Sequence, residues 1–348
     1  MKSLLRLLLK NQHQRNRSNL DQTEKGMTLV ELLVGAIMAF LIITPMLGFV
    51  VDMLNTDRRE QLKSNTEQDL QAAVDFISQD FSQAIYIYDN ASINTIRDQL
   101  PDNGNLNRIP ILVFWKRQRI KNAIPINPTV YNTVKPNQCE KNPGQCNDTD
   151  VLSLVAYYQF KDKDNTWCQP SGDPCPTRIA RYEIRDGIRK PDRVAADTNL
   201  PYYNVADTNP DTQQPDAAFN KDFDFNKPTK NVTTGTVFPT PQVLVNYIDH
   251  SINAQTQLPL TECQTALGNP KDQKTEQPLA ETALKVTDTE GRNSFYACVD
   301  TARNIARVTL RGNSLRRLQA NDADFKTTSS AFFPTATLQI KGLGARGK

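Results

Sequence analysis

The most constraining feature of this sequence is an uncharged apolar run close to its N-terminus. Residues 32–51 read LLVGAIMAFLIITPMLGFVV, twenty positions without a charged side chain. At about 1.5 Å of rise per helical residue, the run spans roughly 30 Å, the thickness of the hydrocarbon core of a bilayer. The sequence therefore predicts a single transmembrane helix. Pro45 removes one backbone N–H from this helix, so we expect a kink or local unwinding there.

The charges that precede the run predict its orientation. Six basic and two acidic residues fall in residues 1–26, so this leader has a formal charge of +4, and the rest of the chain, out of a total of +3, has −1. Lysine and arginine accumulate on the cytoplasmic side of membrane helices. We therefore expect a single-pass protein of the inner (cytoplasmic) membrane, with its C-terminal domain in the periplasm or in an extracytoplasmic filament. Because the basic charge does not lie on a folded domain, no nucleic-acid partner is expected.

Two features separate this segment from a secretory signal. The run is longer than the apolar region of such a signal, and no A-x-A-like cleavage site follows it before the charged stretch NTDRREQ. In addition, the carboxylate of Glu31 directly precedes the run, and an ionisable group in a membrane segment is expensive and marks a function with a partner. The helix is therefore expected to stay attached, with membrane lipid around it and a specific partner for Glu31.

The residues around this carboxylate form a motif. In order they are Lys25, Gly26, Met27, Thr28, Leu29, Val30 and Glu31. A basic leader that ends in glycine, followed by an apolar residue, Thr, Leu, a fourth residue and Glu, resembles the type III signal of type IV prepilins and type II secretion pseudopilins. The resemblance implies that prepilin peptidase cuts after Gly26, that Met27 becomes an N-methylated N-terminus, and that Glu31 serves assembly by pairing with the α-amino group of a neighbouring subunit. Phenylalanine is commoner than methionine at the place of Met27 in this family.

The chemistry of these residue types agrees with the roles that the family implies. Glycine gives a peptidase an unobstructed backbone at the scissile position. The new amino group and the carboxylate of Glu31 would compensate each other inside the membrane, so that the cost of burying either charge alone favours assembly. The alternative is a signal anchor in which Glu31 only reaches the lipid surface.

A second helical pattern follows the apolar run. Apolar side chains recur at mostly three-, four- and seven-residue intervals, at Leu62, Leu70, Ala73, Val74, Ile77, Phe81 and Ile85. This spacing predicts one apolar face of a helix. No Pro or Gly occurs between Met53 and Tyr88, so we expect the membrane helix to continue, with a break near Asn55, as a stalk that packs on a globular domain. Residues 69–80 resemble the corresponding helix of minor pilins and of the larger minor pseudopilins.

Past Ala91 the pattern changes to short apolar runs between polar, turn-rich stretches, which predicts strands. The candidates are Ile109–Trp115, Val151–Phe160, Arg178–Arg185, Gln242–Ile248, Ser294–Val299, Ile305–Arg311 and Ala336–Ile340. The second and third of them are expected to form one hairpin, and the fifth and sixth another. The fold class is thus expected to be α+β, an antiparallel sheet laid against the long N-terminal helix, which is also what the resemblance to pilins implies.

The expected organisation has four parts. They are a cleaved cytoplasmic leader at residues 1–26, a transmembrane N-terminal methylation segment at 27–53, an amphipathic stalk helix at 54–90 and an exported β-rich globular domain at 91–348. Within the last part, residues 191–241 contain seven prolines among many Asp, Asn and Thr residues. This composition predicts a surface insertion, either a solvated loop or a contact surface for a filament neighbour or cargo.

All six cysteines lie beyond residue 138, in the part expected outside the cytoplasm, which favours disulfides. Fifteen pairings are possible. Near neighbours close the smallest loops, so we expect Cys139 with Cys146, Cys168 with Cys175, and Cys263 with Cys298. Buried reduced thiols are the alternative. A zinc site is disfavoured because the short Cys spacings of such sites are missing.

No motif predicts catalysis, and we expect neither enzymatic activity nor a cofactor. The chain has only two histidines, His13 and His250, and no nucleophile-elbow, zincin, Walker or dinucleotide motif. The acidic stretches KDKDNT (161–166) and KDFDFN (221–226) offer oxygen atoms for calcium, a cation that some pseudopilins bind, but they lack the spacing of an EF-hand loop. Solvated turns are the expected interpretation of both, and no metal site is assigned.

The sequence leaves two functional hypotheses. In the first, the chain is a minor pseudopilin or minor pilin that works with prepilin peptidase, other major and minor subunits and an inner-membrane assembly platform, in protein or polysaccharide secretion or in motility. The runs DTDVLSLVAYY and SFYACVD look similar to J-class type II secretion pseudopilins, to PilW-like minor pilins, and to pseudopilins of hormogonium polysaccharide secretion in filamentous cyanobacteria. In the second, the chain is an extracytoplasmic enzyme or binding protein that a signal anchor tethers to the membrane.

Overall fold

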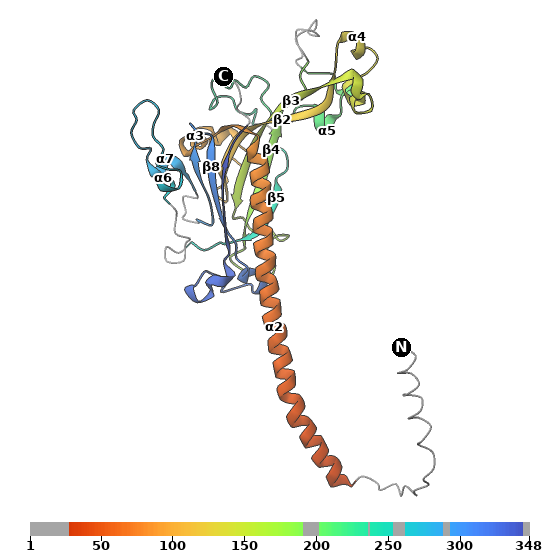
Figure 1. The fold of residues 1–348 in the computed structure, drawn as a ribbon, viewed down its shortest axis with the longest axis vertical. Coiled ribbons are helices and arrows are strands. Elements are labelled where there is room, and N and C mark those ends of the chain that lie inside the picture. The colour runs from red at the N-terminus through yellow and green to blue at the C-terminus, as the bar shows by residue number, and fades with distance from the viewer. Residues whose placement is uncertain (1–27, 191–201, 236, 253–261, 288–292, 344–348) are drawn as a thin grey trace, which may run out of the picture. The chain divides into compact units, whose positions relative to one another are not determined.

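The structure is a computed structural model that describes residues 28–190, 202–235, 237–252, 262–287 and 293–343. The chain divides into two parts, residues 1–58 and residues 59–348. In the first part, the described residues form the beginning of one long helix. The second part contains the end of that helix and all the sheets (Figure 1).

The long helix is α2 (Leu29–Ser82), and it differs from the prediction near Asn55 and at its end. It remains helical at Pro45 and runs through Asn55 without a break. One missing N–H is therefore not enough to interrupt the helix. It also ends at Ser82 rather than near residue 90, because Ala84–Ile87 forms a strand, β1, that pairs with the segment around Trp115.

The second part follows a simple order of elements. After β1 come α3 (Asn90–Ile96), β2 (Arg108–Pro125), α4 (Pro128–Tyr131), β3 (Cys146–Phe160), β4 (Thr177–Arg185), α5 (Pro210–Gln213), β5 (Gln242–Ile248), α6 (Cys263–Ala266), α7 (Glu281–Leu284), β6 (Lys285–Val286), β7 (Phe295–Asp300), β8 (Ile305–Arg311), α8 (Leu315–Leu318) and β9 (Thr335–Lys341). Short 3₁₀ turns lie between them at Arg97–Gln99, Pro136–Lys141, Pro143–Gln145, Val205–Asp207 and Thr327–Phe332. All seven predicted strands are present, and β5 and β8 have the predicted bounds.

The strands form two antiparallel sheets, which confirms the α+β fold class. One sheet has the order β1-β2-β3-β4-β5 and the other the order β6-β7-β8-β9. Both predicted hairpins are confirmed, β3 with β4 and β7 with β8. The two sheets meet where β5 ends, through a bridge between Ile248 and Gly312 and a hydrogen bond from the N–H of Asp249 to the carbonyl of Arg311.

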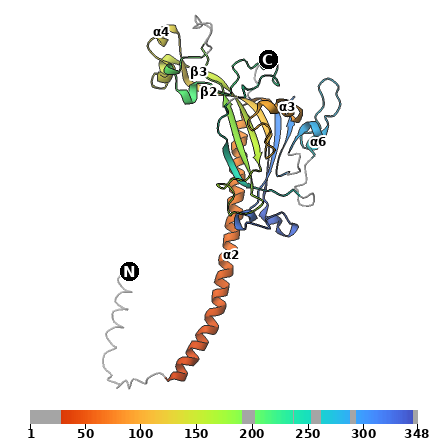
Figure 2. The same cartoon turned by 180° about the vertical axis from the view of Figure 1, so that it is seen from behind.

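The main core lies between the end of α2 and the sheets. The predicted apolar stripe supplies it, since Leu70, Ala73, Val74, Ile77 and Phe81 are all buried. Phe81 meets Phe114 of β2 edge to face at 5.1 Å between ring centroids, a favourable geometry for an aromatic pair. Burial of this stripe attaches α2 to the sheets in the second part of the chain (Figure 2).

The proline-rich insertion is only partly solvated where the structure describes it: Phe219 and Val232 are buried, whereas Val205 and Val237 are exposed. Its aromatic side chains pack on Trp115, which points away from α2 and is fully buried. The Trp115 ring stacks on Phe223 at 4.2 Å and lies edge-on to Phe219 at 6.1 Å. The phenol of Tyr88 donates to the carbonyl of Pro228 at 2.6 Å. The insertion thus covers the face of the five-stranded sheet opposite to α2, because that face is itself apolar.

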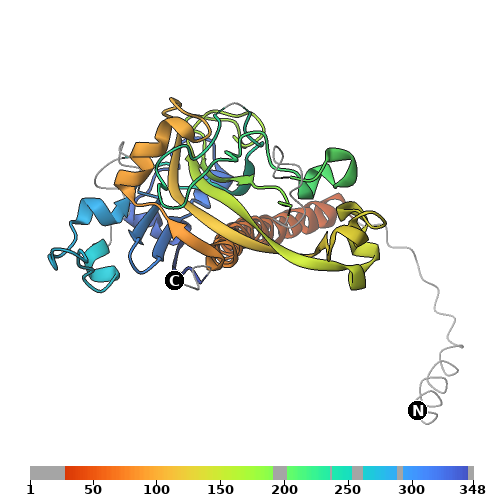
Figure 3. The same ribbon diagram turned by 90° about the horizontal axis from the view of Figure 1, so that it is seen from above.

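Strands β2 and β3 extend beyond their neighbours as a two-stranded arm. Strand β4 pairs with β3 only from Ser153 onward, and β1 reaches β2 only at Lys116, so the ribbon beyond these residues is flanked on neither side by a strand of the sheet. The arm leads to α4 (Figure 3). Two small apolar clusters lie along it, separate from the main core, and one of them includes Ile188 and Tyr203 from beyond β4. No pattern in the sequence predicted this arm.

The three disulfides pair as predicted. Cys139 bonds to Cys146 at the end of the arm, Cys168 to Cys175 in the β3–β4 connection, and Cys263 to Cys298 between α6 and β7. The structure contains no free cysteine among the residues that it describes.

Candidate functional site

The helix α2 begins with a built cap at the motif found in the sequence. The hydroxyl of Thr28 accepts a hydrogen bond from the N–H of Glu31 at 3.3 Å, and the carbonyl of Thr28 accepts from the same N–H at 3.0 Å. Thr-x-x-Glu is the pattern of a capping box, in which the threonine satisfies a free N–H and the glutamate stands in the first turn. Glu31 is therefore placed where the partial positive charge of the helix N-terminus favours a carboxylate.

The described part of the predicted signal is Thr28, Leu29, Val30 and Glu31. These four residues lie at the start of α2 and are exposed. Lys25, Gly26 and Met27, which carry the predicted processing site, lie outside the described residues. The structure thus gives the motif a local role in starting the helix, a role that sequence reasoning had not assigned to Thr28.

The first part of α2 exposes an unusual apolar surface. Every residue from Leu29 to Gln61 is exposed, and the large apolar side chains range from Leu29 at 84% to Val50 at 48%. This helix contains the one segment in the described residues that is long and apolar enough to cross a membrane. An apolar surface of this extent needs a cover of lipid or protein, because about 25 cal/mol is lost for each Å² of apolar surface left in water.

The other end of α2 carries a buried cluster of charges. Asp80, in the last turn, accepts hydrogen bonds from Lys116 Nζ at 2.8 Å and from Arg181 Nε at 2.7 Å. The phenol of Tyr157 donates to the same carboxylate at 2.8 Å. Glu183 completes the cluster by pairing with Lys116 at 2.9 Å and with Arg181 at 2.7 Å. The helix is thereby bonded to three strands at once, β2, β3 and β4.

The electrostatics of this cluster are balanced. Two carboxylates face two cations, so the net charge is zero. Burial by itself would raise the pKa of Asp80, but the hydrogen bond and charge of Arg181, with the charge of Lys116, hold that pKa below its ordinary value. The pKa of Glu183 is lowered by the same two cations against the effect of burial. Both carboxylates therefore stay ionised inside the protein, and the cluster acts as a fixed polar clamp rather than as an acid–base centre.

The acidic stretches considered for calcium have other partners. Asp162 pairs with Arg108 and with Arg178, each at 3.0 Å. Asp164 accepts from the N–H of Thr166 at 2.8 Å, and Asp224 accepts from the N–H of Asn226 at 2.9 Å, both within local turns. No group of three or more potential metal ligands occurs among the residues that the structure describes. The arrangement is that of turns held by their own aspartates.

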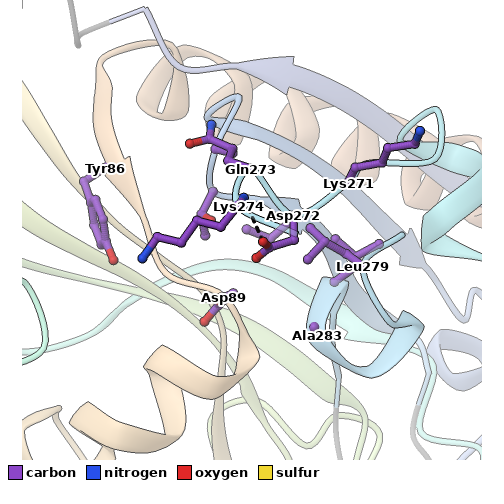
Figure 4. Close-up of a pocket in the computed structure, with 12 residues that line it drawn as sticks. Tyr86, Asp89, Lys271, Asp272, Gln273, Lys274, Leu279 and Ala283 are labelled. Atoms are coloured by element: carbon purple, nitrogen blue, oxygen red, sulfur yellow. Dashed lines mark hydrogen bonds between the residues drawn. The ribbon is translucent and has the colours of Figure 1, made fainter. Parts of the chain in front are cut away.

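One surface pocket lies between the start of α3, the α6–α7 connection and the β7–β8 turn. Its volume is about 460 Å³, and Figure 4 shows Tyr86, Asp89 and Lys274 along one side of it. Both of its carboxylates are engaged with backbone N–H groups: Asp89 caps α3 through Ser92, and Asp272 holds its own turn. The pocket therefore shows no pair of groups arranged for acid–base or nucleophilic chemistry.

No family model matches the chain, and neither a curated protein nor a solved structure matches it at a significant level.

Proposed function

We propose that the chain is a minor pilin-like subunit, a pseudopilin or pilin, that prepilin peptidase processes and that assembles into an envelope-spanning filament in secretion or pilus-dependent motility. The observation that carries the proposal is one uninterrupted helix with two different ends. Its beginning exposes an apolar surface with the carboxylate of Glu31, and its end is clamped in an α+β domain by Asp80. Such a helix can pack against copies of itself at one end and carry a rigid domain at the other.

The carboxylate of Glu31 supports this proposal in a second way. Its side chain is exposed at the start of α2, and Lys25 and Met27 lie outside the described residues. In a lipid environment an unpaired carboxylate is expensive, and the N-terminal amine that cleavage after Gly26 would create is a suitable partner from a neighbouring subunit. The partners are then the peptidase, other major and minor pilin-like subunits, the inner-membrane platform and the surrounding lipid. The chain is a substrate of an enzyme in this scheme, and it works without a cofactor.

The decisive experiment is mass spectrometry of the full chain purified from its own membranes. We expect a methylated N-terminus at Met27, and an unprocessed chain when the prepilin peptidase is absent. Substitution of Gly26 by leucine should block cleavage, because a side chain replaces the open backbone at the scissile position. A chain that keeps Met1 while the peptidase is active contradicts the proposal and favours a tethered extracytoplasmic protein.

A further inference from the structure

The outer edge of strand β9 is a regular, unpaired sheet edge. The hydrogen bond from the Gly312 N–H to the Pro334 carbonyl and the bond from the Gly342 N–H to the Asn304 carbonyl set the register with β8. In that register the even-numbered residues of β9 bond to β8. The residues whose N–H and C=O groups point outward are Thr335, Thr337, Gln339 and Lys341. None of these outward backbone groups has a hydrogen-bond partner in the described part of the chain.

The other three sheet edges differ from this one. Strand β6 has two residues, and β1 has four and an irregular register. Strand β5 is as long as β9, but its register with β4 shifts twice. Proteins protect long edges with bulges, prolines, charges or short strands, because an open edge is a template for another strand. Strand β9 has seven residues, no register shift, no proline, and one charge at its last position.

The side chains of β9 indicate what would pair there. Its outward residues are exposed, whereas Ala336, Leu338 and Ile340 are half-buried and pack against the main core. A strand added beside β9 would continue both rows, with apolar side chains on the core side and polar ones on the solvent side. The chemistry is that of an uncharged extended segment of about seven residues with alternating polarity.

A second copy of this chain is a poor occupant. Strand β9 starts beside Gly312, which packs on Thr66 and Leu70 of α2, and it is followed by Leu343, whose N–H donates to the carbonyl of Ser82 at 3.0 Å. Strand β9 therefore runs in the same direction as α2. A two-fold pairing of two β9 edges would reverse residues 59–82 of one copy relative to those of the other, so the two copies could not stand parallel as subunits of the proposed filament. The remaining edges of a second copy are the short or irregular ones.

We propose that the β9 edge is a docking site for an extended segment of a different chain, which adds a strand to the four-stranded sheet. The exclusion of a second copy rests on the proposed function. The hydrogen bonds of such an added strand come from the backbone, so affinity depends on the outward N–H groups, and the row of Ala336, Leu338 and Ile340 selects the partner's apolar positions.

The test uses a variant that removes an outward donor and leaves the β8 ladder intact. Thr337→Pro does this, because its N–H points away from β8, a position that tolerates proline on an edge. Thr337→Ala is the matched control, since it loses the hydroxyl that meets Thr309 but keeps the N–H. The probe is a photoreactive benzoylphenylalanine in place of Gln339, introduced into the full chain in its native membranes.

We expect the wild type and Thr337→Ala to cross-link to a different chain with similar yield. Thr337→Pro should cross-link about tenfold less, the effect of losing about one good hydrogen bond. A cross-linked dimer of this chain, no cross-link in the wild type, or equal yields with Thr337→Pro would overturn the proposal.

Hydrogen exchange gives an independent measurement without any substitution. The amides of Thr337, Gln339 and Lys341 should exchange fast in the detergent-solubilised chain and slowly in membrane assemblies, whereas the β8-facing amide of Leu338 should be slow in both. Fast exchange of the outward amides in the assemblies contradicts strand addition. Mass spectrometry of Met27 in the same samples separates the two proposals: a methylated Met27 with an open β9 edge leaves the filament role in place and rejects only the docking site.

Discussion

Replacing Asp80 by asparagine tests whether the buried cluster clamps α2 to the sheet. Asparagine has nearly the same shape, so the packing around it is kept. The substitution removes one of the two negative charges and leaves Lys116 and Arg181 facing Glu183 alone. The cluster then has a net charge of +1 beneath the helix, and the side chains of both cations are only 7–8% exposed.

The expected loss is large for a single substitution. Breaking a buried ion pair by removing one partner costs about 3–5 kcal/mol, because the other charge stays buried without compensation. The side chains of Asp80, Lys116 and Arg181 are only 6–8% exposed, so solvent screening does not reduce this figure much. At about 2–4 °C per kcal/mol for domains of 150–250 residues, the midpoint of thermal unfolding should fall by roughly 10 °C.

The assay is chemical unfolding of the full chain in detergent, followed by tryptophan fluorescence. Trp115 is fully buried one residue from Lys116 and reports on the region next to the cluster. Asp75→Asn is the matched control: it lies on the same helix, is exposed, and accepts only from Gln71. Its free energy of unfolding should stay within about 0.5 kcal/mol of the wild type.

A second variant distinguishes charge balance from loss of a hydrogen bond. Asp80→Asn combined with Lys116→Met restores neutrality, since Arg181 and Glu183 still pair at 2.7 Å. The double variant should be more stable than Asp80→Asn alone, a coupling that independent sites do not show. If Asp80→Asn unfolds like the wild type, or if the two substitutions are additive, the cluster does not hold the helix by charge.

Three further outcomes are expected. The pKa values of Asp80 and Glu183 are lowered in the folded protein, so the stabilisation from these carboxylates is fully present above their ordinary pKa values of 3.8 and 4.5. It is lost as the pH falls through their pKa values in the folded protein. Acid titration should therefore destabilise the wild type more than Asp80→Asn. Glu31→Gln removes the charge but keeps a residue that can serve in a capping box, so it should abolish co-purification with other pilin-like subunits. Thr28→Val should weaken the start of the helix by about 1 kcal/mol and leave co-purification intact. Arg316→Lys should destabilise the domain by about 1–3 kcal/mol in the same unfolding assay, because the fully buried guanidinium donates to the carbonyls of Pro170 and Pro174, which an ammonium cannot reach together.

The sequence predicted those elements whose own residues determine them. The helix stripe and the strands have periods of about 3.6 and 2, so a single segment contains the whole signal. Strand β1 was missed for the same reason: Ile85 continues the helical stripe, and only the pairing of Ala84–Ile87 with β2 makes the segment a strand. The arm was missed because the second half of β2, RQRIKN, is polar and is held in strand form by β3 rather than by a buried face.

The sites that depend on distant residues were beyond sequence reasoning. The partners of Asp80 lie far from it in the sequence: Lys116, Tyr157 and Arg181 follow it by 36, 77 and 101 positions. No local spacing relates these residues. The insertion did contain a usable signal. Phe219, Phe223 and Phe225 are large apolar residues in a segment otherwise rich in Pro, Asp and Thr, and aromatic residues in such a segment indicate packing rather than a solvated loop.

The negative charges of the two carboxylates near the ends of α2 are compensated in different ways, and this difference bears on the proposed function. Asp80 stands in the last turn, where the helix dipole disfavours a negative charge, and the chain provides two cations to compensate for it. Glu31 stands in the first turn, where the dipole supplies part of a compensating charge, and no cation of the described chain reaches it. That partial charge is enough in water but not in lipid, where a carboxylate needs a full counterion. In the proposed filament a neighbouring subunit supplies that counterion at the apolar end of the helix, whereas the cations that compensate Asp80 belong to the chain itself.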